Sequence, residues 1–195
     1  MGGKIFTQTK WIEELRKGRP VFSLPELVRI TGLPPASARR AVSRLVKRRF
    51  LIKLSKGLYG NAFAHLSLEQ VAGMLYPPAY ISVESALFTH GVIDQTPHIV
   101  TCITLNKTKT FRTALGEILY YHIKSGLFFG FHPQDGLVLA GPEKAAADYV
   151  YIKRQNGLFP DLDEWNWGNL DLLNLREILK SYPKSVEKHI MEFAH

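Results

Sequence analysis

Hydrophobic residues in the first part of the chain recur at helical spacing in two short segments. The apolar side chains of Trp11–Leu15 share one helical face and Gly18 follows them, which predicts a first helix that ends at a glycine. Ser23–Glu26 has the pattern of a capping box, in which the serine and the glutamate each bind a backbone N–H group at the start of a second helix. Gly32–Pro34 is expected to end that helix, because glycine accepts the left-handed conformation and proline cannot continue a helix.

A third helix is predicted from Pro35 to Arg48, and its two faces differ in chemistry. An apolar stripe recurs at three- and four-residue steps and is expected to face the core: Ala38, Ala41, Val42, Leu45 and Val46. The opposite face carries hydroxyl and basic side chains: Ser37, Arg40, Ser43, Arg44 and Lys47. The third helix therefore has one side for packing and one basic side for a partner.

A small β-hairpin with a basic tip is predicted next. Its strands are Leu51–Leu54 and Leu58–Gly60, and Ser55–Gly57 lies between them. The order helix, helix, tight turn, basic helix and basic hairpin is that of a winged helix-turn-helix. We therefore expect residues 1–62 to form a winged helix-turn-helix DNA-binding domain.

The pattern after this hairpin is a mixture of helices and strands. One helix is expected after Ser67, with Gln70 as its capping partner, and another is expected to be capped by Ser82 and to end before Gly91. Strands are predicted from β-branched and aromatic residues at Ile99–Leu105 and Ile118–Ile123, with weaker candidates at Leu127–Phe131 and Gly136–Leu139. Further helices are expected at Pro142–Lys153, Leu172–Leu179 and Val186–Phe193. The predicted fold class is α+β, with the winged helix-turn-helix followed by a mixed α/β C-terminal domain of residues 63–195.

The charge distribution sharpens this division. The chain of 195 residues is 46% hydrophobic and carries a formal net charge of +8. Residues 1–60 hold 14 Lys and Arg against three acids, a net charge of +11, whereas the rest holds 11 bases and 14 acids, a net charge of −3. A basic first part beside a nearly neutral second part indicates two modules with different partners. The partner of the basic first module is expected to be a polyanion.

Several classes of protein are disfavoured by composition. Cys102 is the only cysteine, which excludes an internal disulfide framework and a multi-thiolate zinc site. The N-terminal segment has no apolar signal core, and the apolar runs are too short to span a membrane, so we expect a cytoplasmic protein without a membrane partner.

The basic helix and hairpin supply the candidate DNA-binding residues. Arginine paired with guanine is the commonest specific base contact, which makes Arg39, Arg40 and Arg44 candidates for reading bases, Arg40 and Arg44 above all. Small hydroxyl side chains approach phosphates or bases closely, whereas hairpin lysines contribute mainly counterion release. The full candidate set is Ser37, Arg39, Arg40, Ser43, Arg44, Lys47, Arg48, Lys53 and Lys56.

A simpler interpretation is that these charges form an ordinary solvated helix face. Against it, residues 27–60 contain no Asp or Glu, so no intrahelical salt bridge offsets the repulsion and an external counter-charge is favoured. Double-stranded DNA fits better than RNA, because no aromatic stacking platform accompanies the basic face.

Catalytic patterns in the second half are weak. Glu143, Lys144 and Asp148 lie close together on one predicted helix, as an acid and lysine cluster of a nuclease would, but charged residues at a helix start are more simply a response to the helix dipole. The seven histidines show no HExxH spacing, and no glycine-rich phosphate loop occurs. Cys102 lies in an apolar strand pattern and is expected to be a buried small hydrophobe. We therefore predict no catalytic residue, no metal site and no cofactor.

Three segments also resemble a known family. The basic winged helix-turn-helix is followed by Tyr80–Leu87 (YISVESAL), then by His90–Ile93 (HGVI), and later by Gly141–Asp148 (GPEKAAAD). This combination, over roughly residues 10–153, resembles the AbiEi antitoxins of abortive-infection toxin–antitoxin systems.

The resemblance implies a bacterial or archaeal autorepressor that binds inverted repeats upstream of its own operon. A dimer and cooperatively binding monomers are both compatible with the sequence. It also implies a functional counterpart, a nucleotidyltransferase-like toxin, which the C-terminal domain counteracts without necessarily touching it. Two other hypotheses remain open from the sequence: a ligand-sensing regulator with an effector pocket in the second half, and a DNA-targeted nuclease whose active site includes Glu143 or Asp148.

Overall fold

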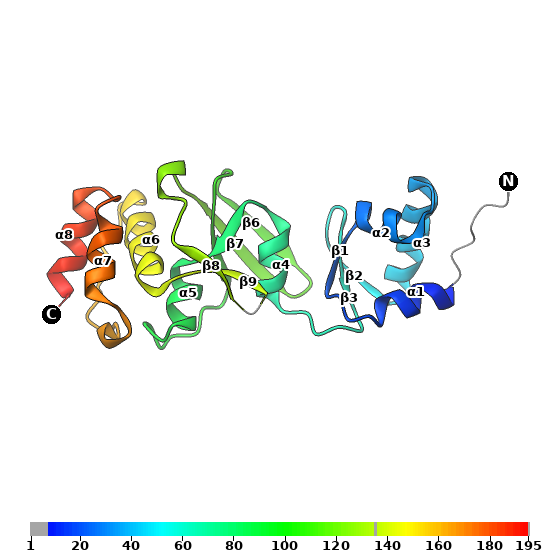
Figure 1. Ribbon diagram of the computed structural model, residues 1–195, viewed down its shortest axis with the longest axis horizontal. Coiled ribbons are helices and arrows are strands. Elements are labelled where there is room, and N and C mark those ends of the chain that lie inside the picture. The colour runs from blue at the N-terminus through cyan, green and yellow to red at the C-terminus, as the bar shows by residue number, and fades with distance from the viewer. Residues whose placement is uncertain (1–7, 135, 195) are drawn as a thin grey trace. The chain divides into compact units, whose positions relative to one another are not determined.

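The structure is a computed structural model that describes residues 8–134 and 136–194. Its internal contacts divide the chain into two compact units. The first unit contains the residues up to Val71 together with Thr113–Gly116, and the second contains Ala72–Arg112 and the residues from Glu117 onward. Each unit combines helices with a β-sheet, which confirms the α+β class (Figure 1).

The first unit is a winged helix-turn-helix. Its elements in chain order are α1 (Gln8–Leu15), β1 (Val21–Ser23), α2 (Leu24–Thr31), α3 (Pro35–Lys47), β2 (Leu51–Ser55) and β3 (Leu58–Asn61). The strands form an antiparallel sheet in the order β1-β3-β2, so the predicted hairpin gains a third strand. The sequence did not reveal β1, because its three residues are too few to show alternation.

Local signals determine where α2 begins and ends. The Ser23 hydroxyl accepts a hydrogen bond from the backbone N–H of Glu26, and the Glu26 carboxylate accepts one from the backbone N–H of Ser23 at 2.8 Å, so the predicted capping box is confirmed. Gly32 ends α2 in the left-handed conformation with φ 62°. Only three residues then separate α2 from α3, which gives the tight turn of the motif.

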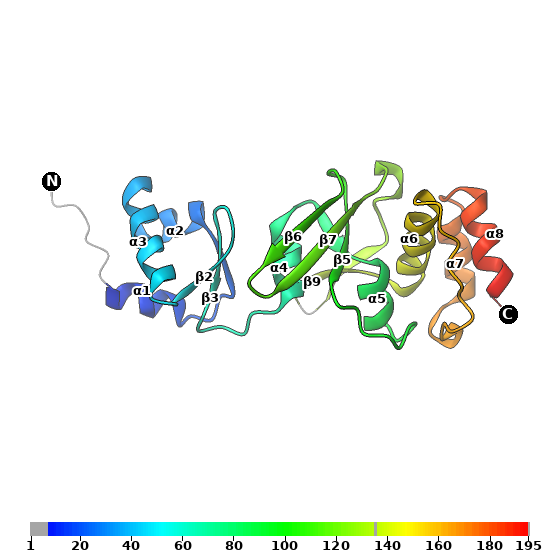
Figure 2. The same ribbon diagram turned by 180° about the vertical axis from the view of Figure 1, so that it is seen from behind.

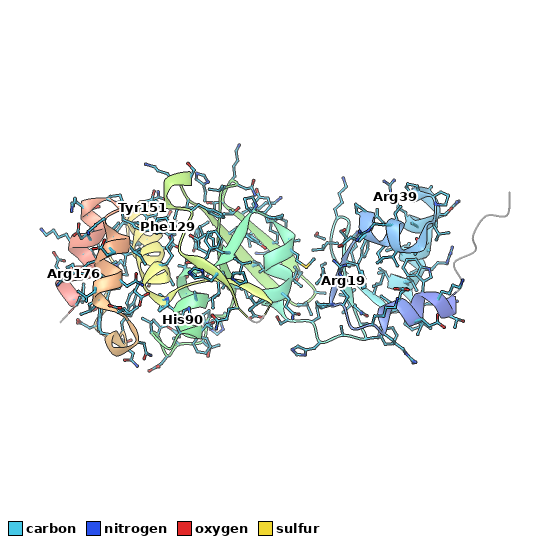
Figure 3. The ribbon with its side chains drawn as sticks, viewed as in Figure 1. Arg19, Arg39, His90, Phe129, Tyr151 and Arg176 are labelled. Atoms are coloured by element: carbon cyan, nitrogen blue, oxygen red, sulfur yellow. The ribbon has the colours of Figure 1, made fainter. Side chains whose placement is uncertain are left out.

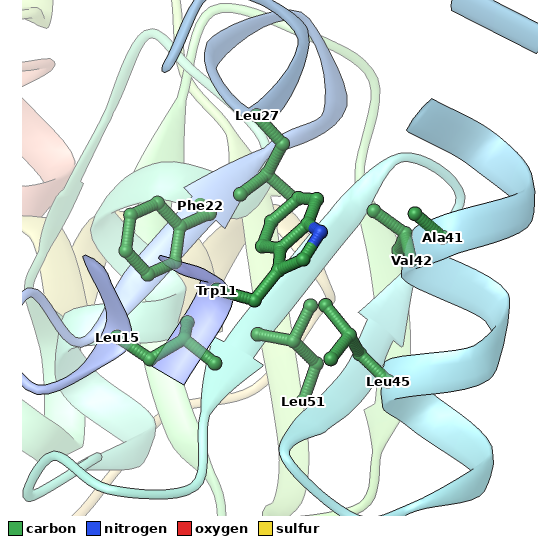
Figure 4. Packing of buried hydrophobic residues seen from close by; sticks show 8 residues of the cluster. All are labelled: Trp11, Leu15, Phe22, Leu27, Ala41, Val42, Leu45 and Leu51. Atoms are coloured by element: carbon green, nitrogen blue, oxygen red, sulfur yellow. The ribbon is translucent and has the colours of Figure 1, made fainter. Parts of the chain in front are cut away.

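The core of the first unit forms around Trp11. Side chains from α1, β1, α2, α3 and β2 pack against one another, and Figure 4 shows them: Trp11, Leu15, Phe22, Leu27, Ala41, Val42, Leu45 and Leu51. The apolar stripe predicted for α3 is therefore buried, although Val46 at its edge is only half-buried. Buried Asn61 joins α1 to the sheet, since its amide donates hydrogen bonds to the carbonyls of Leu15 at 2.7 Å and Arg19 at 2.8 Å.

The second unit is built on a mixed sheet. The elements that follow β3 along the chain are α4 (Leu68–Leu75), β4 (Ala79–Ile81), α5 (Val83–Thr89), β5 (Val100–Thr104), β6 (Lys109–Thr113), β7 (Gly116–His122), β8 (Phe131–Gln134), β9 (Leu137–Ala140), α6 (Pro142–Gln155), α7 (Leu172–Leu179) and α8 (Lys184–Phe193), with short 3₁₀ turns η1 (Ser125–Leu127) and η2 (Trp167–Asn169). The sheet has the strand order β6-β7-β5-β4-β9-β8. The β4–β5 and β8–β9 pairs are antiparallel, whereas the β5–β7 and β4–β9 pairs are parallel.

Helices cover both faces of this sheet. The part of α4 from Ala72 onward packs on one face, where the Tyr120 hydroxyl donates a hydrogen bond to the Ala72 carbonyl at 2.6 Å. Figures 1 and 2 show α5 and α6 on the opposite face, with α7 and α8 packed on the far side of α6. All five residues of β5 are buried, as expected for a strand covered on both faces.

Two predictions for the second unit are wrong, and two of its strands were missed. The segment Leu127–Phe131 is not a strand, because η1 and an irregular turn occupy most of it and β8 begins only at Phe131. The Ser82 side chain does not cap α5, since its hydroxyl donates to the Asp148 carboxylate at 2.8 Å instead. Strand β6 and the short strand β4 were not predicted at all.

Candidate nucleic-acid interface

Helix α3 is held by its buried stripe so that its other side faces solvent. Its buried residues pack against α2 and β2. Successive helical residues are rotated by about 100°, which places Arg40, Ser43 and Lys47 at the centre of the exposed side. Arg44 lies on one flank and Arg39 on the other, where Figure 3 shows it at the surface of the unit.

The predicted residues of α3 are therefore largely on one surface. Arg39, Arg40, Ser43, Arg44, Lys47 and Arg48 are exposed. Ser37, by contrast, is half-buried on the Arg44 flank, so its hydroxyl is the least accessible of the set. We call the exposed side of α3 formed by Arg39, Arg40, Ser43, Arg44 and Lys47 the basic face.

The cations of the basic face lack partners within the described part of the chain. Neither a carboxylate nor any other hydrogen-bonding group lies within bonding distance of Arg39, Arg40, Arg44 or Lys47 there. Two other cations of the first unit are paired, Lys17 with Glu14 and Arg19 with Glu26. Because the charges on α3 repel one another without compensation, a polyanion would bind this face favourably.

The wing formed by β2 and β3 carries the two predicted lysines. Lys53 is exposed on β2 opposite Tyr59, and Lys56 is exposed at the turn between the strands, beside Gly57 with φ 80°. The Gly57 carbonyl accepts a hydrogen bond from the backbone N–H of Leu24 at 2.8 Å, so the tip of the wing is tied to the start of α2. Neither lysine has a partner among the described residues, and each is available to a phosphate.

The acid and lysine cluster of α6 has a different character from the basic face. Lys144 and Asp148 are both 0% exposed, and their Nζ and Oδ1 atoms lie 2.5 Å apart. The Tyr182 hydroxyl accepts a hydrogen bond from Lys144 at 2.5 Å and donates one to Asp148 Oδ1 at 2.6 Å. The other carboxylate oxygen, Oδ2, accepts from the hydroxyls of Tyr80 at 2.9 Å and Ser82 at 2.8 Å.

These contacts satisfy the buried charges completely. The ammonium group also lies over the aromatic rings of Tyr80, Phe129 and Tyr182, at 5.1–5.5 Å from their centroids. Burial lowers the pKa of Lys144, and the Asp148 carboxylate opposes that shift. Burial also raises the pKa values of Tyr80 and Tyr182, with a further contribution from the Asp148 charge.

Glu143 also has a structural environment that the helix-dipole interpretation did not anticipate. Its side chain is 6% exposed, and its two oxygens accept hydrogen bonds from the backbone N–H of Asp171 and the amide of Asn174, both at 2.9 Å. Glu143 therefore ties the start of α7 to α6. Glu143 and Asp148 are therefore both buried and hydrogen-bonded within the second unit.

Cys102 and two of the histidines lie in buried or backbone-bonded positions. Cys102 on β5 is buried, as predicted. His90 and His189 bind backbone carbonyls at 2.8 Å, and no group of three potential metal ligands occurs within residues 8–134 and 136–194. Within the same residues, no helix is long and apolar enough to cross a membrane.

Sequence reasoning overlooked one exposed cation of this region. Arg49 follows the predicted end of the third helix, and its backbone has φ 60°. The run Lys47–Arg49 was visible as a charge cluster, but the conformation of its last residue was not.

Comparison with known proteins identifies the motif directly. Residues 12–54 match the IclR helix-turn-helix domain. The match extends from α1 through α2 and α3 into β2, so it contains the whole basic face. The first unit therefore contains an IclR-type helix-turn-helix DNA-binding domain. No curated protein matches the chain with significant sequence similarity.

Proposed function

We propose that this protein is a transcriptional autorepressor, which binds inverted repeats in the DNA upstream of its own gene. The observation that carries the proposal is the basic face, an exposed and uncompensated set of cations on the third helix of an IclR-type helix-turn-helix. In such motifs this helix enters the major groove, where arginine side chains reach guanine bases.

We infer different tasks for the basic residues from their positions. Arg40 and Arg44 project from adjacent turns of α3 and are suited to read base edges. Arg39, on the other flank, and Lys47, in the last turn of α3, are suited to bind phosphates, as are Lys53 and Lys56 on the wing. Affinity then comes from many cations and specificity from few, and binding should weaken steeply as salt concentration rises.

A matched pair of double variants tests the proposal. Arg40→Ala/Arg44→Ala removes two charges from the basic face, whereas Arg176→Ala/Lys188→Ala removes two exposed charges from α7 and α8 in the second unit. Fluorescence anisotropy would measure the affinity of each for upstream DNA and for a scrambled duplex. We expect the first variant to lose about 100-fold in affinity for upstream DNA together with its preference over the scrambled duplex. Unchanged selectivity in that variant, or an equal loss in the control, would refute the assignment.

We further propose that the protein is the antitoxin of an AbiE-type system. Support comes from the sequence resemblance and from the way two of its segments, Tyr80–Leu87 and Gly141–Asp148, meet. Tyr80 and Ser82 of the first of these segments both donate hydrogen bonds to Asp148 of the other, across a separation of 68 and 66 residues. The two motifs together thus define a core of the second unit, as expected if both belong to one domain type.

Growth assays in a bacterial host test the antitoxin role. The neighbouring reading frame should encode a nucleotidyltransferase-like protein whose expression arrests growth, and co-expression of this chain should restore growth. Continued arrest despite a folded and expressed protein would refute the role.

A ligand-sensing regulator is the second candidate function, and the pockets of the second unit are the observation that favours it. A cavity of about 1000 Å³ is lined by acidic and aromatic residues, among them Glu84, Tyr149 and Trp165. A smaller one of about 490 Å³ is lined by residues of η1 and of the segment between α7 and α8. Release of the protein from upstream DNA by a small molecule would favour this candidate over a constitutive repressor.

We infer that the protein acts without catalysis. The carboxylates that a nuclease would need, Glu143 and Asp148, are engaged in buried hydrogen bonds. Incubation with DNA and Mg²⁺ or Mn²⁺ tests this inference, since sustained cleavage that disappears in Asp148→Asn would overturn it.

A further inference from the structure

Arg49 has an unusual backbone conformation for its residue type. It follows α3 with φ 60°, in the left-handed region that non-glycine residues rarely adopt. Its N–H donates to the Val46 carbonyl at 3.0 Å, and the N–H of Phe50 donates to the Leu45 carbonyl at 2.9 Å. These two bonds form a Schellman motif, which requires a left-handed residue at this position and is usually completed by glycine.

The other described helices that end at a left-handed residue all have glycine there. Gly18 follows α1, Gly32 follows α2, Gly91 follows α5 and Gly157 follows α6, with φ between 62° and 83°. Only α3 ends in a left-handed residue that carries a side chain, among the helices that the structure describes. Arginine at this place strains the backbone, so some other interaction must favour it.

That interaction is not found inside the described chain. The Arg49 side chain is exposed, and no carboxylate, carbonyl or aromatic ring among residues 8–134 and 136–194 binds it. The dipole of α3 already has cations in its last turn, Arg44 and Lys47, and a further cation beside them adds repulsion. A partner outside the chain, of negative charge, explains the arginine better.

We propose that Arg49 binds a backbone phosphate of the DNA duplex at the C-terminal end of α3. This inference rests on the proposed function, and it adds a residue to the DNA-binding set that contributes affinity without base specificity. Residues at the end of a recognition helix lie beside the sugar–phosphate backbone when the helix is in the major groove. The planar guanidinium group suits a phosphate, to which it donates two parallel hydrogen bonds.

The test separates the backbone cost of Arg49 from its contact with DNA. Arg49→Gly relieves the left-handed strain and removes the cation, whereas Arg49→Lys keeps both the strain and the charge. Arg176→Ala, an exposed charge on α7, controls for the loss of one positive charge. Hydrogen exchange of the α2 and α3 amides in the full chain measures stability, and anisotropy with an upstream duplex and a scrambled duplex of about 30 base pairs measures affinity.

We expect Arg49→Gly to slow amide exchange about fivefold and to weaken binding of both duplexes about tenfold, with the slope of log affinity against log salt reduced by about one. The affinity of Arg49→Lys should lie within a few-fold of that of the wild type, and the affinity of Arg176→Ala should equal that of the wild type. Unchanged DNA affinity in Arg49→Gly, or faster exchange in that variant, would overturn the inference while leaving the proposed function intact. Failure of the wild-type protein to bind either duplex would instead refute the proposed function.

Discussion

Replacing Lys144 by methionine should destabilise the second unit strongly. Methionine has nearly the same length and fills the space among the Tyr80, Phe129 and Tyr182 rings, so the variant removes the ammonium group with little change in packing. It leaves the Asp148 carboxylate, which is 0% exposed, without its cation. The cost of breaking a fully buried ion pair by removing one partner is about 3–5 kcal/mol.

The reciprocal change, Asp148→Asn, should cost a similar amount because it leaves the buried ammonium without its anion. In the double variant both side chains are neutral, so no buried charge is left without a partner. The carbonyl oxygen of the introduced asparagine then accepts from Tyr80 and Ser82, and its amide group donates to the Tyr182 hydroxyl. We therefore expect the double variant to cost about 3 kcal/mol less than the sum of the single variants.

Urea unfolding of the full chain measures this coupling. Trp165 and Trp167 report on the second unit, whereas Trp11 reports on the first. The transition that the variants shift is therefore that of the second unit, and its midpoints with unchanged slopes give the differences in free energy. Single variants that cost less than about 1 kcal/mol, or costs that simply add, would refute the view that the pair is buried and mutually dependent.

Three further predictions concern local contacts and pH. Ser23→Ala removes the cap of α2 and should lower the stability of the first unit by about 1 kcal/mol, measured by amide exchange; an unchanged rate would contradict the capping role. Asn61→Ala removes the buried side-chain hydrogen bonds to the Leu15 and Arg19 carbonyls and should cost about 3 kcal/mol, with the loss visible in α1 amides first. Burial raises the pKa values of tyrosines in the second unit, so the folded chain keeps protons that the unfolded chain releases near pH 10. The free energy of unfolding of that unit should therefore fall as pH rises from about 9 to 11, by up to about 1.4 kcal/mol per pH unit for each such tyrosine. The urea midpoint should fall with it, and a flat profile would contradict this. Lys144 opposes the trend, because a pKa lowered by folding makes the folded state more stable as pH rises toward 10.5.

Features that depend on neighbours in the chain were predictable from sequence. The caps at Ser23 and Ser67 are bonds between residues three apart, and the structure contains both. The stripe of α3 depends only on helical spacing, and its burial followed from the positions of its apolar residues. The exposed basic face was predicted for the same reason.

Features that depend on distant residues were not predictable. Ser82 has the right position to cap α5, but Asp148 competes for its hydroxyl from 66 residues away. Strands β1 and β6 are short or largely exposed, and they become strands only through pairing with β3 and β7. The conformation of Arg49 is likewise set by the bonds of Phe50 to the last turn of α3, where the sequence offers no glycine as a signal.

The partners of the cations explain why the first unit should dominate binding to DNA. In the second unit several lysines are compensated internally: Lys144 by Asp148, Lys153 by Glu84, Lys180 by Glu177 and Lys184 by Glu187. The cations of the basic face have no such partners among the described residues, so their field extends into solvent. Each neutralised phosphate releases counterions, so the slope of log affinity against log salt concentration should depend on the number of cations on α3 and the wing. Removing cations of the second unit should change that slope little. The local charge of the first unit, rather than the net charge of the chain, is therefore the quantity that sets affinity.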